Sequence, residues 1–201
     1  MLISEAIGNR LRGDQRLVLA IAGPPAAGKS TLAAEVVALL QPTAALVAMD
    51  AFHLDDAVLT ARGHRDRKGA PHTFDVDGYR HLMRRIRSDR DRPIAVPVFD
   101  RSMELSRAAA LMVEPHHTVV VTEGNWLLLD DERWFELREL FDLTVMLTAP
   151  EETLVQRLRA RWERHGYPSV AIEQKLTGND VPNARIVAAN SGPADLVLVS
   201  G

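Results

Sequence analysis

Residues 23–30 read Gly-Pro-Pro-Ala-Ala-Gly-Lys-Ser and fit the phosphate-binding pattern G-x-x-x-x-G-K-[ST]. In such a loop, backbone N–H groups surround phosphate oxygens, Lys29 reaches the terminal phosphates, and the Ser30 hydroxyl ligates Mg²⁺. A chance glycine-rich turn is disfavoured because a strand-like apolar run precedes the loop and a helix-like segment follows it. We therefore predict that a nucleoside triphosphate is bound by Gly23, Pro24, Pro25, Ala26, Ala27, Gly28, Lys29, Ser30 and Thr31.

Two carboxylates each follow an apolar run directly. Asp50 ends the run 44–49, and Glu123 ends the run 119–122. Asp50 is a candidate to orient an attacking hydroxyl and accept its proton, although an Asp that caps a turn has the same pattern. Glu123 resembles a Walker B acid that holds Mg²⁺, with a solvated loop residue as the alternative.

Residues 62–75 form a basic, glycine-punctuated segment without a clear period, which predicts a loop. Its cations could bind an anionic acceptor near Asp50, but for Arg65, Arg67 and Lys68 individually a solvated surface position is favoured. Asp75 ends the segment and opens a helix. It is either the N-cap of that helix or a ligand of acceptor hydroxyls.

A second basic segment, residues 157–166, is helical in pattern. Arg157, Arg161 and Arg164 fall on one helical face by their i, i+4 and i+3 spacing. Arginines on a closing segment could neutralise a transferred phosphoryl group, whereas a solvated helix with Glu163 as a partner is an equally simple reading.

These residues must be positioned by an α/β framework. The expected strands are residues 17–22, 44–49, 119–122, 143–147 and 196–199, and residues 94–99, with Pro93 and Pro97, are an edge strand or an extended loop. The expected helices are residues 1–12, 29–40, 76–90, 131–140, 151–165 and 169–189, the last in two pieces because of Pro182. Because ligands bind at the carboxyl ends of parallel strands, Gly23, Asp50 and Glu123 are expected to converge.

The composition narrows the classes of function. The 201 residues carry a net charge of −3, which argues against a nucleic-acid-binding surface. The absence of cysteine excludes disulfides, thiolate metal sites and cysteine nucleophiles, and it is compatible with the cytoplasm, where we expect the protein. The apolar stretches are too short to span a membrane, and the seven histidines have no metal-ligand spacing.

Taken in order, the motifs resemble the uridine kinase, phosphoribulokinase and bacterial pantothenate kinase group of P-loop kinases. The likeness is greatest to a bacterial branch labelled fructose transport system kinase, and residues 67–71 and 179–184 look like marks of that branch. The ordered segments that carry the resemblance are 23–30, 49–53, 73–75, 97–101, 106–107, 123–124, the arginine-rich helix and 194–197.

The resemblance implies roles for individual positions. Asp50 would activate the acceptor hydroxyl, Glu123 would be the Walker B acid, and Asp75 would bind acceptor hydroxyls. The acceptor pocket would also include His53, Phe99, Arg101 and Arg107. The family's phosphate-clamping lid would contain Arg157, Arg161 and Arg164.

Two departures from the nucleoside kinases speak against uridine or cytidine. The family's D-S-F-Y-like stretch is replaced by residues 50–53, Asp-Ala-Phe-His. The histidine-rich base-recognition pattern is replaced by residues 103–105, Met-Glu-Leu.

We therefore predict a single P-loop domain over residues 1–201: a three-layer sandwich with a five-stranded parallel sheet, a helical lid near 157–168 and an acceptor-binding insertion near 52–107. The expected activity is transfer of the γ-phosphoryl group of ATP, with Mg²⁺, to a hydroxyl of a sugar, nucleoside or vitamin-like metabolite. The rivals are a regulatory NTPase that hydrolyses ATP or GTP without such an acceptor, and a nucleic-acid-linked kinase. The oligomeric state is left open, a homodimer included.

Overall fold

A computed structural model describes residues 2–13 and 15–201, so the first residue of the expected N-terminal helix lies outside the described part. Its central sheet has five parallel strands in the order β2-β5-β1-β6-β7. This confirms the predicted fold class. The strands are β1 (Leu17–Ala22), β2 (Ala44–Leu46), β5 (Val119–Gly124), β6 (Leu143–Thr148) and β7 (Leu196–Val199).

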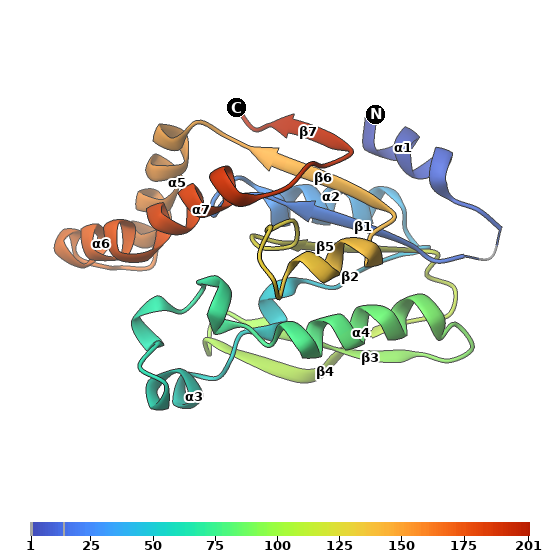
Figure 1. Cartoon of the computed structure of the whole chain (residues 1–201), viewed down its shortest axis with the longest axis horizontal. Helices are drawn as coiled ribbons and strands as arrows, with labels where there is room; N and C mark the ends of the chain where they lie inside the picture. The colour runs from blue at the N-terminus through green and yellow to red at the C-terminus, as the bar shows by residue number, and fades with distance from the viewer. Residues whose placement is uncertain (1, 14) are drawn as a thin grey trace.

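Helices cover both faces of the sheet and make the three layers visible in Figure 1. Strand β1 is buried throughout, and its side chains alternate between two hydrophobic clusters. Leu19 and Ile21 pack with α1 (Leu2–Arg10) and α2 (Lys29–Leu39). On the opposite face, Val18 and Ala20 pack with α4 (Val76–Ser88) and with η4 (Phe135–Leu140), a 3₁₀ helix.

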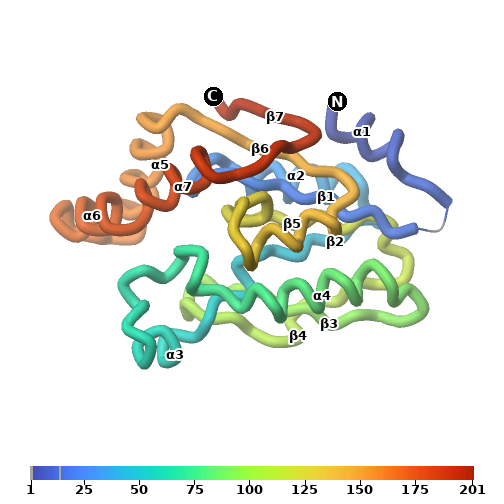
Figure 2. Tube along the Cα trace, viewed as in Figure 1, coloured from blue at the N-terminus to red at the C-terminus, as the bar shows by residue number. Residues whose placement is uncertain are grey.

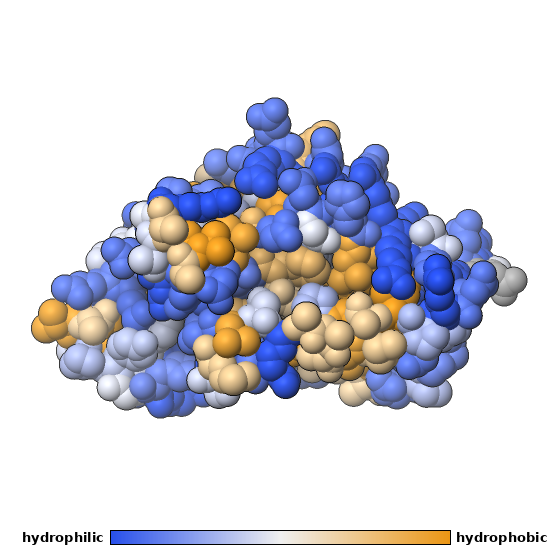
Figure 3. Space-filling view, turned by 90° about the horizontal axis from the view of Figure 1, so that it is seen from below, coloured by the Kyte–Doolittle hydropathy of each residue, from blue (hydrophilic) through white to orange (hydrophobic). Residues whose placement is uncertain are grey.

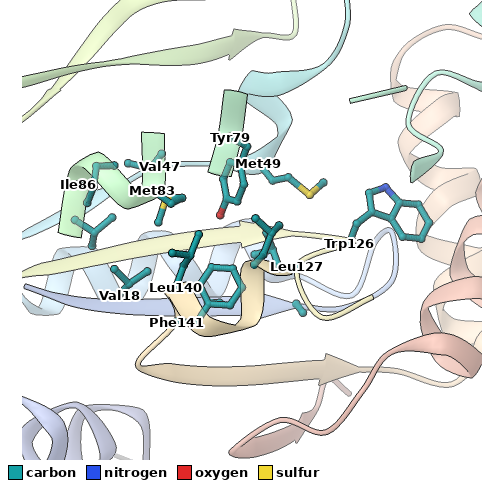
Figure 4. Packing of buried hydrophobic residues seen from close by; sticks show 14 of the residues in the cluster. Val18, Val47, Met49, Tyr79, Met83, Ile86, Trp126, Leu127, Leu140 and Phe141 are labelled. Carbon is teal, nitrogen blue, oxygen red and sulfur yellow. The ribbon is translucent and has the colours of Figure 1, made fainter. Parts of the chain in front are cut away.

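The cluster beneath α4 reaches the carboxyl end of β5. Figure 4 shows Tyr79 and Met83 of α4 among Met49, Leu127 and Leu140. The buried Tyr79 hydroxyl lies 2.7 Å from Thr122 Oγ1, one residue before Glu123. This hydrogen bond fixes the end of β5 from below the sheet.

Chain segments beyond the sheet form a β-hairpin under α4. Strand β3 (Ile94–Asp100) pairs antiparallel with β4 (Leu105–Val113), and the surface viewed from that side mixes hydrophobic and hydrophilic side chains (Figure 3). The strand alternative for residues 94–99 is correct, but β4 was not predicted. Its run Ala108-Ala109-Ala110 is exposed and lacks the alternation and β-branched residues that identify strands.

Other boundaries also differ from the sequence-based expectations. Strand β2 ends at Leu46 rather than residue 49, because Met49–Phe52 turns into a 3₁₀ helix, η1. A short helix that was not predicted, α3 (Asp56–Ala61), precedes the expected loop 62–75. That loop contains two short 3₁₀ helices, η2 (Arg65–Arg67) and η3 (Pro71–Thr73). Of the expected helix 131–140, the structure contains only η4.

The C-terminal third forms a helical arm at the carboxyl ends of the strands, where β6 and β7 point in Figure 1. Helix α5 (Glu151–Arg164) is followed by α6 (Ser169–Lys175), a π-helical turn η5 (Leu176–Asp180) and α7 (Val181–Asn190). The predicted break at Pro182 is confirmed, with proline in the first turn of α7. Figure 2 follows the chain from α7 back into β7, beside β6.

Candidate active site

The glycine-rich loop connects β1 to α2 and depends on two of its glycines. A Cβ at Gly23 would lie 2.2 Å from the Leu147 carbonyl oxygen on neighbouring β6, so a side chain cannot fit there. Gly28 has φ +98° at the start of α2, in the left-handed region that glycine tolerates. The loop therefore places backbone N–H groups at the positive end of α2, which favours an anion.

Lys29 is held over this loop. Its side chain is buried, and Nζ donates to the Pro24 carbonyl oxygen at 2.9 Å and to Asn125 Oδ1 at 2.7 Å. Burial lowers the pKa of Lys29, while the negative charges of Glu123 and Asp50 oppose that shift. Asn125 was not among the predicted site residues. The signal that could have found it is its position two residues after the acid that ends β5.

Ser30 and Glu123 meet because β1 and β5 are adjacent and in register, with Ile21 opposite Glu123. Ser30 Oγ donates to Glu123 Oε1 at 3.0 Å. Glu123 is only 6% exposed, and burial together with the charge of Asp50 raises its pKa. Hydroxyl and carboxylate oxygens suit Mg²⁺, which keeps several waters and takes few protein ligands. Residues 2–13 and 15–201 contain no group of three His, Cys, Asp or Glu side chains that could hold a metal ion.

Asp50 lies in η1, directly beyond the carboxyl end of β2. Its Oδ2 accepts from Arg101 Nη2 at 2.6 Å. Burial alone would raise the pKa of Asp50, but the charge of His53 in its protonated form and the charges of Arg101 and Lys29 outweigh burial and hold that pKa below its usual value. The carboxylate is therefore ionised at neutral pH.

His53 forms an aromatic wall beside Asp50. Its Nδ1 lies 2.7 Å from the Asp50 carbonyl oxygen, which can only accept, so Nδ1 carries the proton. The ring lies between Phe74, at a centroid distance of 4.1 Å, and Phe99, at 4.9 Å. Burial lowers the pKa of His53, so the ring is neutral at pH 7 and its Nε2 is an acceptor.

Cations of the hairpin and the basic loop surround Phe99. Lys68 Nζ lies 5.4 Å from the ring centroid and bonds Asp56 Oδ1 and the Glu104 carbonyl oxygen, each at 2.7 Å. Arg107 pairs with Asp100 at 3.2 Å. Lys68 is thus a fastened, largely buried side chain rather than a solvated one.

Asp75 is the N-cap of α4. Its Oδ1 accepts from the Gly78 backbone N–H at 2.9 Å, and the residue is exposed. The capping alternative is therefore the one that the structure contains. Its role toward acceptor hydroxyls stays a prediction.

The three arginines of α5 have different surroundings. Arg161 is half-buried beside Trp162, 5.3 Å from the ring centroid, and burial together with the nearby charge of Arg101 lowers its pKa. Arg157 instead donates to Ser200 Oγ at 2.9 Å and to the Ala26 carbonyl oxygen at 3.4 Å. Arg164 is exposed and donates to the Ala160 carbonyl oxygen of its own helix. Of the three, only Arg161 is brought close to Asp50 and Arg101.

The two segments that mark the bacterial branch contact each other. Arg67 Nη1 donates to the Gly178 carbonyl oxygen at 2.6 Å, and Asn179 Nδ2 donates to the Lys68 carbonyl oxygen at 2.8 Å. Trp126 Nε1 also bonds the Gly69 carbonyl oxygen at 3.0 Å. The helical arm is thereby joined to the basic loop on the acceptor side of Asp50.

Comparison with known proteins gives the class. A family model described as an AAA domain matches residues 19–175. The YggC protein of Escherichia coli (strain K12) is 35% identical over 190 residues, which cover 92% of this chain and 78% of that protein. A putative uridine kinase of Schizosaccharomyces pombe (strain 972 / ATCC 24843) is 28% identical over 199 residues, covering 94% of this chain and 85% of that protein.

A solved structure is similar over nearly the whole length. The crystal structure of a putative fructose transport system kinase from Silicibacter sp. TM1040 has 37% sequence identity and a TM-score of 0.91, covering 98% of this chain and 97% of that one. A pantothenate kinase of Xanthobacter autotrophicus (strain ATCC BAA-1158 / Py2) is 28% identical and covers 75% of this chain, but only 49% of that enzyme is matched.

The chain belongs to the AAA-domain family of P-loop proteins. The resemblance to kinases of the uridine kinase and pantothenate kinase type is confirmed, and with it the class of enzyme, a phosphotransferase with a small-molecule alcohol as acceptor. In the described part of the chain, no helix combines the length and the apolar character needed to cross a bilayer.

Proposed function

We propose that the protein transfers the γ-phosphoryl group of ATP to a hydroxyl group of a small metabolite. The observation that carries this proposal is the placement of Asp50 beside the phosphate loop. Its charge is close enough to influence the pKa values of both Lys29 and Glu123. In phosphoryl transfer, a carboxylate in that position orients the acceptor hydroxyl and accepts its proton. A switch protein that only binds a nucleotide does not need such a carboxylate.

The nucleotide is held by the loop over residues 23–31. Lys29, released from Pro24 and Asn125, binds the terminal phosphate oxygens. Ser30 and Glu123 would hold Mg²⁺, which would neutralise negative charge on the phosphates. Residues 157–168 form the lid, with Arg161 as the arginine that faces the transferred group, and residues 52–107 form the acceptor-binding insertion of one domain.

In the transfer step, Asp50 accepts the proton of the attacking hydroxyl. As the acceptor oxygen forms its bond to the γ-phosphorus, the bond from that phosphorus to the β–γ bridging oxygen breaks and ADP leaves. The hydroxyl proton moves to the Asp50 carboxylate and then to solvent. Lys29 and Arg161 stabilise the negative charge on the oxygens during transfer, so catalysis rests on positioning and electrostatics.

The acceptor is a small metabolite with a free hydroxyl. His53, Phe99, Arg101 and Arg107 line its pocket, and Asp75 offers a second carboxylate. A sugar or a vitamin-like acid fits this mixture of aromatic and cationic side chains better than a pyrimidine nucleoside, because the expected base-recognition residues are replaced.

The test is a screen of sugars, nucleosides, vitamins and their acids with ATP and Mg²⁺, read by the mass of the product. A phosphorylated acceptor formed by the wild type and not by Lys29→Met supports the proposal. Steady ATP or GTP hydrolysis that no acceptor increases, together with stimulation by a protein, would instead support the regulatory NTPase.

A further inference from the structure

Asp50, the proposed base, is occupied by a cation in this structure. Arg101 Nη2 lies 2.6 Å from Oδ2, a distance typical of a strong charge-assisted hydrogen bond. A carboxylate oxygen engaged by a guanidinium is a poor proton acceptor. Asp50 Oδ2 therefore becomes available for the hydroxyl proton only when Arg101 leaves it.

Arg101 is placed so that it can leave. It follows Asp100, the last residue of β3, in the turn of the hairpin, and its side chain is 51% exposed. Because the Arg101 guanidinium is half exposed, a competing oxyanion can reach it from solvent and take the place of Asp50 as its partner.

The other cations on the acceptor side already have partners. Lys68 is bonded to Asp56, and Arg107 to Asp100. Among the described residues, Asp50 is the one carboxylate paired with Arg101, and Arg161 takes part in no ion pair. Arg101 is thus the acceptor-side arginine whose ionic partner is the proposed base, so its release frees that base.

We propose that the acceptor carries an oxyanion, a carboxylate or a phosphate, and that this group takes Arg101 away from Asp50 as the acceptor binds. This inference rests on the proposed kinase function. It makes Arg101 the residue that selects charged acceptors, and it frees the base only when the correct acceptor is present. Water has no anionic group, so Arg101 stays paired with Asp50 when only water is present.

The first test measures binding without turnover. The wild type is saturated with Mg²⁺ and a non-hydrolysable ATP analogue, so that the phosphate loop and Arg161 are occupied, and inorganic phosphate or acetate is then titrated by calorimetry or NMR. We expect binding that weakens by about tenfold to a hundredfold in Arg101→Gln, as for loss of a charged hydrogen bond, and that Arg101→Lys partly restores. The control is Arg84→Gln, which removes an exposed cation of α4 that pairs with Glu139 of η4.

The second test compares acceptors that differ in one anionic group: pantothenate against pantothenol, D-glycerate against glycerol, and fructose 6-phosphate against fructose. Preference for the carboxylates or for the phosphate distinguishes the two sources of the oxyanion. Either preference supports the inference if Arg101→Gln abolishes it.

The two proposals fail in different ways. If the ATP analogue does not bind, the kinase function itself is wrong. If the analogue binds but phosphate and acetate bind equally well to the wild type and Arg101→Gln, or do not bind at all, the anion-exchange inference is wrong while the kinase function stands. The inference is also overturned if uncharged acceptors are phosphorylated as fast as their anionic counterparts.

Discussion

Ser30 Oγ donates a hydrogen bond of 3.0 Å to Glu123 Oε1, across the boundary between the first turn of α2 and the end of β5. The two residues are 93 positions apart in sequence. The parallel pairing of β1 with β5 brings them together, since both strands end at the same edge of the sheet. The contact joins the first turn after the phosphate loop to the proposed Mg²⁺ ligand.

Glu123→Gln is expected to stabilise the protein in the absence of ligand. Burial raises the pKa of Glu123 in the folded state above its value in the unfolded chain. The free energy of unfolding therefore falls as the pH rises from the unfolded pKa through the folded pKa, because Glu123 must then ionise while it is buried. Glutamine keeps an oxygen for Ser30 and carries no charge. We expect a gain of about 0.5–2 kcal/mol at pH 7.

Urea denaturation at pH 7 and near pH 4 measures this effect. The gain should shrink at the lower pH, where Glu123 is protonated in both states. The control is Glu139→Gln, an exposed carboxylate paired with Arg84. A Glu123→Gln protein that is less stable than the wild type at pH 7 would show that the buried charge is well compensated. The same variant should need more Mg²⁺ for activity.

Lys29→Met is expected to lower kcat/KM by about 10²–10³, the usual cost of removing one preorganised donor to a developing charge. Methionine fills a similar volume, so the fold is expected to persist. Far-UV circular dichroism checks folding, and product formation from ATP and acceptor measures the loss. Activity close to that of the wild type would rule out the assigned role of this lysine.

Substitutions of two lid arginines, Arg161 and Arg164, are expected to have different effects on kcat. Arg161→Gln removes the guanidinium near Asp50 and should lower kcat by about 10²-fold or more. Arg164→Gln removes an exposed guanidinium that bonds only its own helix in the described structure and should leave kcat nearly unchanged. Equal losses in both variants would contradict the placement of Arg161 as the arginine facing the transferred group.

Arg16 gives a prediction on stability alone. Its guanidinium is buried and donates to carbonyl oxygens of Ile86, Asp89, Glu114 and His117. Arg16→Met would leave several of these acceptors without a partner, at a cost of about 2–4 kcal/mol. Arg12→Met, at an exposed position, should change the free energy of unfolding by less than about 0.5 kcal/mol. Thermal denaturation of the pair measures the difference.

Although β2 ends at Leu46 and Asp50 lies in η1, the parallel sheet and the grouping of Gly23, Asp50 and Glu123 at its carboxyl edge could be predicted from sequence, because a short apolar run leads to each of the three residues. The hairpin strand β4 could not. Its alanines carry no strand period, and its pairing with β3 depends on contacts far away in sequence. α3 could not be predicted either, because its six residues are too few to show a helical period.

The site was predicted in outline only. Helical spacing placed Arg157, Arg161 and Arg164 on one face, but spacing cannot tell which of them reaches Asp50 and which bonds the C-terminal residues. The contact between Arg101 and Asp50 was also beyond sequence reasoning, since it joins the tip of the hairpin to η1. The hydrogen bond between Lys29 and Asn125 and the ion pair between Lys68 and Asp56 likewise form only in the tertiary structure.

The most direct measurement of the proposed mechanism is phosphoryl transfer by Asp50→Asn, alongside its affinity for Mg·ATP. We expect kcat to fall by about 10²–10⁴, the usual contribution of a general base, while the dissociation constant of Mg·ATP stays unchanged because Lys29, Ser30 and Glu123 are intact. Full turnover by Asp50→Asn on an acceptor that the wild type phosphorylates would rule out Asp50 as the group that receives the hydroxyl proton.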